Sequence, residues 1–120
     1  MKFYQDSETR EIIAVREDEA IDTAGKAEVL PNTTDAAQEK HVPVVSREGQ
    51  TVTVTVGSAA HPMAENHFIQ WVLLETESGV ERRELSPGEE PAAQFFVAED
   101  DAVLAAYALC NLHGLWQAAL

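Results

Sequence analysis

The sequence predicts an all-β protein built around one β-sandwich, and two observations support this fold class. The run Thr51–Val56 alternates threonine and valine strictly, which is the period of a strand with one buried face. Further short apolar segments follow at intervals of about ten residues, as in the strands of a sandwich. With 120 residues, of which 45% are hydrophobic, the chain has enough apolar side chains for one packed core.

The first 37 residues are expected to form a small separate lobe, because they are acidic and contain neither histidine nor cysteine. Two short strands of a hairpin are predicted at Phe3–Tyr4 and Ile12–Val15. Residues 25–34 are expected to be a connection with little regular structure.

The larger domain is expected to span residues 38–120. After the alternating strand, which ends at Gly57, glycine, proline and serine mark turns between further strands. These strands are predicted at residues 68–75, 80–85 and 92–97. The segment 102–109 is ambiguous by propensity, because alanine and leucine favour a helix whereas its alternate positions fit one face of a strand. We assign it to a strand.

Composition excludes several classes of partner. The formal net charge is −13, and a surface this acidic repels nucleic-acid phosphates and anionic lipids. No apolar run has the length of a signal peptide or of a membrane span, so a cytoplasmic protein is expected. The single cysteine, Cys110, cannot form an intrachain disulfide, which agrees with a reducing compartment.

All four histidines and the one cysteine fall in the larger domain, each next to a predicted turn or strand end. They are His41, His61, His67, Cys110 and His113. Loops at strand ends are where a rigid scaffold presents functional side chains. The pair Cys110 and His113 also has the C-x-x-H spacing that lets a thiolate and an imidazole bind one ion from a tight turn. This pattern predicts a metal centre.

The residue types restrict the metal without fixing it. Zinc is possible, but a structural zinc site is closed by four ligands and usually contains more thiolate. Four imidazoles and one thiolate suit an octahedral ion such as iron and leave one position open. A blue-copper electron carrier also combines His and Cys on a β-sandwich, but it needs a methionine soon after the last histidine, and none follows His113.

Four segments carry a resemblance to a known family. They are EKHVPV at 39–44, VGSAAHPM at 56–63, HFIQW at 67–71 and CNLHGLW at 110–116. In this order they look like superoxide reductases of the desulfoferrodoxin and neelaredoxin family, and the similarity extends over about residues 33–117.

The resemblance implies an immunoglobulin-like β-sandwich with one Fe(2+)/Fe(3+) ion per chain. By position, His41, His61, His67 and His113 would be the four equatorial ligands, and the Cys110 thiolate would be axial. Such an enzyme reduces superoxide to hydrogen peroxide by one electron and releases no oxygen. The alternative is a non-catalytic metal-binding or electron-transfer β-sandwich protein of the blue-copper type.

The resemblance also implies roles for two neighbours of His41. Lys40 matches the mobile lysine of the family, which adds positive charge over the open position and assists protonation. Glu39 matches a carboxylate that can occupy the sixth position of the oxidised iron. An external electron donor such as rubredoxin and a homodimer or homotetramer are further expectations.

The N-terminal lobe departs from the family pattern. Two-iron members carry a desulforedoxin-like lobe in which four cysteines hold a second iron. At the matching place this chain has Asp6-Ser7-Glu8-Thr9, and no cysteine precedes Cys110. We therefore expect the lobe at residues 1–37 to lack a metal centre. It either keeps the desulforedoxin-like form or is a degenerate surface extension.

Overall fold

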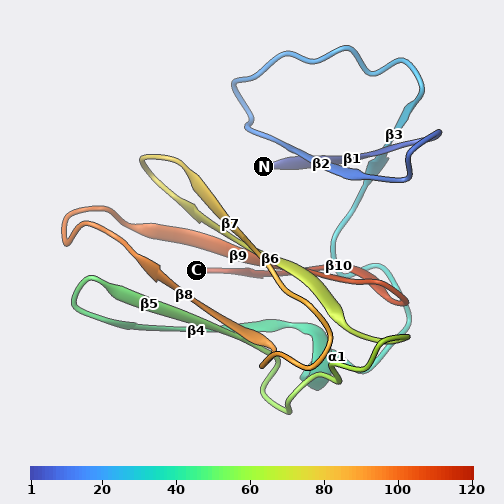
Figure 1. Ribbon diagram of the computed structural model, residues 1–120. Coiled ribbons are helices and arrows are strands. Elements are labelled where there is room, and N and C mark those ends of the chain that lie inside the picture. Colours follow the sequence, from blue (N-terminus) through green and yellow to red (C-terminus); the bar gives the residue numbers. More distant parts are fainter. The chain divides into compact units, whose positions relative to one another are not determined.

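The computed structural model describes residues 1–120, which divide into two units, Met1–Thr33 and Thr34–Leu120 (Figure 1). The sequence predicts this division between residues 37 and 38. Each unit has its own antiparallel sheets. The single helix has four residues, so no helix is long and apolar enough to cross a membrane.

The smaller unit is a three-stranded antiparallel sheet of order β2-β1-β3. Its strands are β1 (Lys2–Asp6), β2 (Ile12–Val15) and β3 (Lys26–Val29). The predicted hairpin is confirmed. The prediction that residues 25–34 lack regular structure is wrong for β3, which pairs with β1 along its whole length. The segment KAEV alternates polar and apolar residues over only four positions, which is too short a pattern to predict a strand, and its strand conformation is secured by pairing with β1.

The turn between β1 and β2 contains the segment Asp6-Ser7-Glu8-Thr9. The carboxylate of Asp6 accepts hydrogen bonds from the backbone N–H groups of Glu8 and Thr9, at 2.8 and 3.0 Å. These bonds hold the pKa of Asp6 below its usual value. Backbone hydrogen bonds to a carboxylate thus close this turn.

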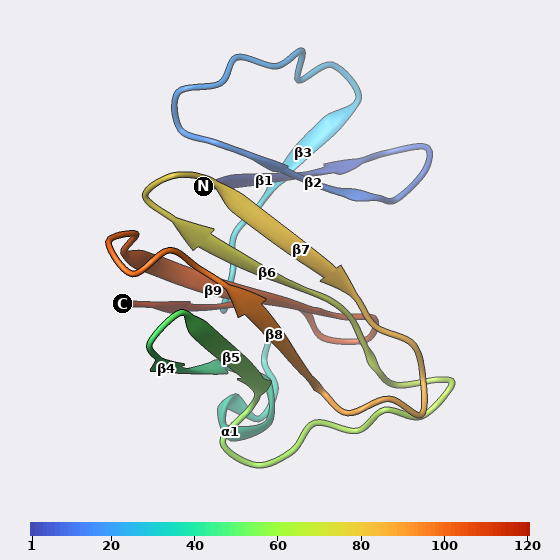
Figure 2. The same ribbon diagram turned by 60° about the vertical axis from the view of Figure 1, so that its left-hand side comes forward.

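The larger unit is a sandwich of two sheets, with strand orders β10-β9-β6-β7 and β4-β5-β8 (Figures 1 and 2). Its elements are α1 (Gln38–His41), β4 (Pro43–Glu48), β5 (Thr51–Val56), β6 (Ile69–Thr76), β7 (Val80–Glu84), β8 (Ala92–Phe96), β9 (Val103–Cys110) and β10 (Gly114–Ala119). The predicted all-β, immunoglobulin-like sandwich with a small N-terminal lobe is confirmed. Three of these elements, α1, β4 and β10, were not among the predicted ones.

The core lies between the two sheets. The valines of β5 are fully buried while its threonines are half-buried, as the alternation predicts. They pack with buried residues of the facing sheet, including Val72, Leu74 and Ala106. Burying a side chain of this size stabilises the fold by about 1.5–3 kcal/mol. The ambiguous segment is the strand β9, because it pairs with β6 on one side and β10 on the other.

Strand register brings the predicted site residues to one end of the sandwich. Cys110, the last residue of β9, pairs with Ile69 at the start of β6 and with Gly114 at the start of β10. His67 and His113 lie just outside these strand ends. In the other sheet, Val56 pairs with Pro43, so the loop after β5 and the helix before β4 also meet.

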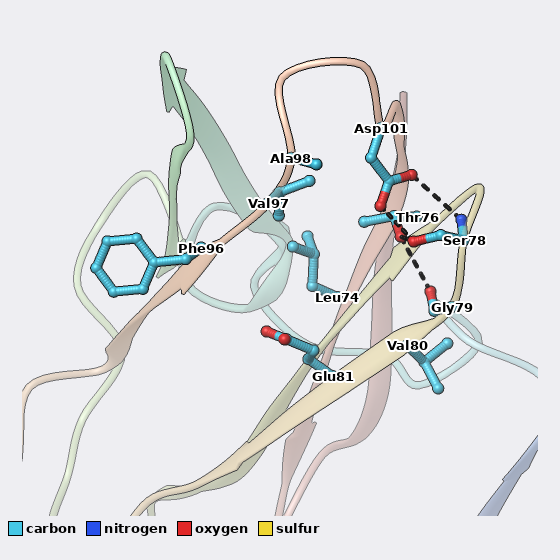
Figure 3. Close-up of a pocket in the computed structure, with 10 residues that line it drawn as sticks. All are labelled: Leu74, Thr76, Ser78, Gly79, Val80, Glu81, Phe96, Val97, Ala98 and Asp101. Atoms are coloured by element: carbon cyan, nitrogen blue, oxygen red, sulfur yellow. Dashed lines mark hydrogen bonds between the residues drawn. The ribbon is translucent and has the colours of Figure 1, made fainter.

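A cavity of about 320 Å³ lies at the opposite end of β6 and β9 (Figure 3). Leu74, Val80 and Val97 line its apolar part. The carboxylate of Asp101 accepts hydrogen bonds from the backbone N–H and the hydroxyl of Ser78, which lower its pKa. These bonds tie the β6–β7 hairpin to the segment that leads into β9. No histidine or cysteine lines this cavity.

Candidate metal centre

The structure brings together all five residues that the sequence predicts as metal ligands. They come from α1, from the β5–β6 loop, from the end of β9 and from the turn before β10. One potential ligand atom from each of His41, His61, His67 and Cys110 lies within 4.8 Å of the others. Nδ1 of His113 is 3.1 Å from Nε2 of His41 and 3.9 Å from Sγ of Cys110.

Backbone carbonyls fix the tautomers of two of these rings. Nδ1 of His41 is 2.7 Å from the carbonyl oxygen of Ala37, and Nδ1 of His61 is 2.6 Å from that of Pro62. A carbonyl oxygen only accepts, so each Nδ1 carries the proton and donates it. Nε2 of each ring is then left with a lone pair. These two Nε2 atoms face each other at 3.2 Å.

This arrangement fits a metal ion better than it fits hydrogen bonding. Two lone pairs face each other with no proton between them, which is unfavourable unless a cation lies beside both. Two nitrogens about 2.1 Å from one ion and at right angles to each other lie about 3.0 Å apart. The observed separations of 3.1 and 3.2 Å are close to this value.

His67 contributes a ring nitrogen that is buried among the other side chains of the cluster. Its Nε2 is buried and has no hydrogen-bond partner. Its ring meets the rings of His61 and His113 edge-on, with centroids 4.7 and 5.1 Å apart. Buried polar atoms are nearly always hydrogen-bonded, so an unpaired buried nitrogen beside other nitrogen lone pairs fits a metal ligand.

The protonation states also suit a metal centre. Burial lowers the pKa of His61 to about 4, and burial is the largest cause of the lowered pKa of His67. Both imidazoles are therefore neutral near pH 7, which is the form that binds metals. Burial raises the pKa of the Cys110 thiol, while the backbone N–H groups of Leu112 and His113 lower it in part. A cation beside this sulfur would favour the thiolate.

Two further residues hold the loops that carry the cluster. The side chain of Asn111 accepts a hydrogen bond from the backbone N–H of Phe68 at 2.9 Å and donates one to the carbonyl of Asn66 at 3.1 Å. It thereby ties the segment around His67 to the turn after Cys110. Gly114 has a φ of 79°, a conformation that glycine adopts without strain, and it reverses the chain directly after His113.

Lys40 and Glu39 lie on α1 beside His41, and both side chains are exposed. The charge of Lys40 contributes to the lowered pKa of His67, so it lies near the cluster. Among the cations of residues 34–120, the three arginines have hydrogen bonds or ion pairs, whereas the Lys40 side chain has neither. The backbone carbonyl of Glu39 accepts hydrogen bonds from Ser58 and Ala59, whereas its carboxylate forms no hydrogen bond or ion pair with the cluster.

Sequence reasoning missed the groups that orient the histidines. The carbonyls of Ala37 and Pro62 are backbone atoms, so no residue type reveals them. Trp116 is buried, and its ring stacks on that of His41 with centroids 4.9 Å apart. A tryptophan three residues after His113 was the one signal available in the sequence.

Four histidines and one cysteine lie together at one end of an all-β sandwich. This arrangement defines the class of metal-binding β-sandwich proteins. The chain belongs to the desulfoferrodoxin family, whose model matches residues 33–119. A desulfoferrodoxin homolog of Archaeoglobus fulgidus is 53% identical over 85 residues, which are 71% of this chain and 66% of that protein.

Proteins named superoxide reductase, which is a kind of oxidoreductase, are also similar to this chain. The protein of that name from Pyrococcus horikoshii is 35% identical, over 66% of this chain and 84% of its own length. The crystal structure of the superoxide reductase from Treponema pallidum matches with a TM-score of 0.80 and 38% identity. That match covers 96% of this chain and 98% of the other.

Proposed function

We propose that this protein is a superoxide reductase, which reduces superoxide to hydrogen peroxide by one electron at a mononuclear non-haem iron. The residues that would hold the iron, one per chain, are His41, His61, His67, His113 and Cys110. The observation that carries this proposal is the convergence of neutral imidazole lone pairs and one sulfur on a single point. The names of the similar proteins support the reaction.

When bound, ferrous iron supplies the electron, and five donors leave one of the six positions of an octahedral ion free. Four neutral imidazoles and one thiolate leave such a site with a single net positive charge. The donor set therefore attracts an anion although the chain as a whole carries −13.

Lys40 is the residue that we assign to substrate attraction and proton delivery. Its ammonium is the cation of the larger unit without a hydrogen bond or ion pair, and its charge acts on His67. At physiological salt a charge acts over about 8 Å, so Lys40 can offset the acidic surface only near the cluster. Reduction of superoxide to hydrogen peroxide consumes one electron and two protons, and Lys40, or water that it orders, would assist the proton transfer.

Glu39 is assigned to closing the oxidised site with its carboxylate. In support, it is exposed and precedes His41 by two residues on the same short helix. Because no cysteine precedes Cys110, the smaller unit cannot build a four-cysteine iron centre, and an external donor such as rubredoxin would supply the electron. We further infer a cytoplasmic homodimer or homotetramer.

Stopped-flow mixing of the reduced, iron-loaded protein with superoxide tests the proposed reaction. Reduction gives one hydrogen peroxide per superoxide consumed, with oxidation of the iron and no oxygen evolved. Dismutation would give one peroxide for every two superoxide ions and would release oxygen. Protein that binds copper or zinc in preference to iron and leaves superoxide unconsumed would instead indicate the non-catalytic alternative.

A further inference from the structure

Trp116 contacts two of the five cluster residues at once. Its indole ring stacks on the ring of His41, with centroids 4.9 Å apart and an interplanar angle of 27°. Its Nε1–H donates a hydrogen bond to the carbonyl oxygen of His113 at 3.0 Å. One buried side chain thus links two residues that are 72 positions apart in the sequence.

His41 has few other restraints. It ends a helix of four residues whose N-cap residue makes no side-chain hydrogen bond. The rings of His61 and His113 meet it edge-on, at 75° and 87°, while Trp116 covers a face of the ring. The bond from Nδ1 to Ala37 fixes the tautomer, and the flat indole limits rotation of the imidazole about its bond to Cβ.

Trp116 itself is held firmly. It lies in β10 opposite Ala108 of β9, and its side chain is 1% exposed. Through this indole, the sheet that contains β10 supports His41, which lies on a helix outside both sheets. Its hydrogen bond to His113 anchors the turn that separates β9 from β10.

We propose that Trp116 is a positioning residue of the metal centre, which aligns Nε2 of His41 with Nδ1 of His113 so that both reach one ion. This inference rests on the proposed metal centre but not on its reaction with superoxide. Outer contacts of this kind typically change metal affinity by about 10–100-fold when they are removed.

Two substitutions separate the two contacts. Trp116→Phe keeps an aromatic ring to stack on His41 but lacks the N–H donor. Trp116→Leu loses both contacts. With Co²⁺ as the probe, measured by competition with a chelator, we expect the dissociation constant to rise about tenfold for Trp116→Phe and about 100-fold for Trp116→Leu. The visible bands of bound Co²⁺, which report ligand geometry, should shift for Trp116→Leu and stay near those of the wild type for Trp116→Phe.

Trp71 provides the matched control. It is also buried, at 4% exposed, and its ring contacts Arg82 and no histidine. Trp71→Phe and Trp71→Leu should lower the stability of the sandwich while leaving Co²⁺ affinity and the visible bands unchanged. If substitutions at both tryptophans weaken Co²⁺ binding equally, or if the Trp116 variants bind as the wild type does, the inference is wrong.

A second measurement applies if Trp116→Leu does not fold. Trp71→Phe leaves Trp116 as the only tryptophan, so its fluorescence reports the ring stacked on His41. Zn²⁺ should change this emission and saturate at one ion per chain, and unchanged emission with bound Zn²⁺ would overturn the inference. Wild-type protein that binds neither ion would refute the metal centre itself. Tight binding with no reaction toward superoxide would refute only the proposed function.

Discussion

Gly57 follows β5 directly and leaves no space for a side chain, so replacing it with alanine tests how closely α1 must lie against the β5–β6 loop. An added Cβ would lie 2.7 Å from the carbonyl oxygen of Glu39 and 2.9 Å from the carbonyl carbon of Lys40. Ordinary contact begins at 3.4 Å, and both neighbours are backbone atoms that cannot rotate away. The backbone of α1 would therefore have to move by about 0.7 Å.

This displacement acts on the metal centre because His41 is the last residue of α1. Its Nε2 lies 3.2 Å from His61 and 3.1 Å from His113, so a shift of this size removes it from the point that the other ligands share. For Gly57→Ala we expect a loss of about 1–3 kcal/mol in the free energy of unfolding, as for overpacking. We expect Co²⁺ affinity to fall about 10–100-fold.

Gly79→Ala is the control, since an added Cβ there meets nothing within 4 Å and the residue is not in the left-handed region. Its free energy of unfolding should stay within about 0.5 kcal/mol of the wild-type value. Urea unfolding of the metal-free protein and chelator competition with Co²⁺ measure the two effects separately. Gly57→Ala with wild-type stability and wild-type Co²⁺ affinity would refute the close packing of α1.

Four further predictions concern the cluster and its supports. Lys40→Ala should slow the reaction with superoxide and weaken its dependence on ionic strength, and an unchanged rate with an unchanged salt response would remove this residue from the mechanism. Cys110→Ser should abolish the thiolate-to-ferric absorption band and weaken superoxide reduction; full activity would show that the sulfur is not a ligand. Asn111→Ala should cost about 1–2 kcal/mol of stability and lower Co²⁺ affinity, while Asn111→Asp, which keeps the acceptor, should lose less. Hydrogen bonds from Ser78 lower the pKa of Asp101. These bonds therefore stabilise the fold at pH values above the ordinary carboxyl pKa, and the stabilisation is lost as the pH falls through the lowered pKa of Asp101. The difference in urea midpoint between Ser78→Ala and the wild type should therefore shrink in acid, and a difference independent of pH would contradict this assignment.

The fold was predictable where one local pattern decides it. Strict alternation located β5 from end to end, and turn residues separated β6, β7 and β8. The elements that were missed depend on distant partners. β3 exposes half of its residues and forms by pairing with β1, and α1 is a single turn that no periodicity can reveal.

The candidate site residues could be selected by type, because the chain has only four histidines and one cysteine, and the structure brings these five side chains together. Their geometry was not predictable. The tautomers of His41 and His61 depend on two backbone carbonyls, and the orientation of His41 depends on an indole in β10. The roles proposed for Lys40 and Glu39 came from the family resemblance, since exposed charges on a short helix have no distinguishing local pattern.

Strand register links the fold to the site. Cys110 shares a face of β9 with Ala106 and Ala108, and all three belong to the buried core between the sheets. A shift of one residue in the pairing of β9 would move the alanines to the outer face and would turn the sulfur away from the histidines. The apolar core therefore selects the register that places Cys110 in the cluster. The C-x-x-H spacing can bring His113 to the same point only because that register and the turn at Gly114 are both fixed.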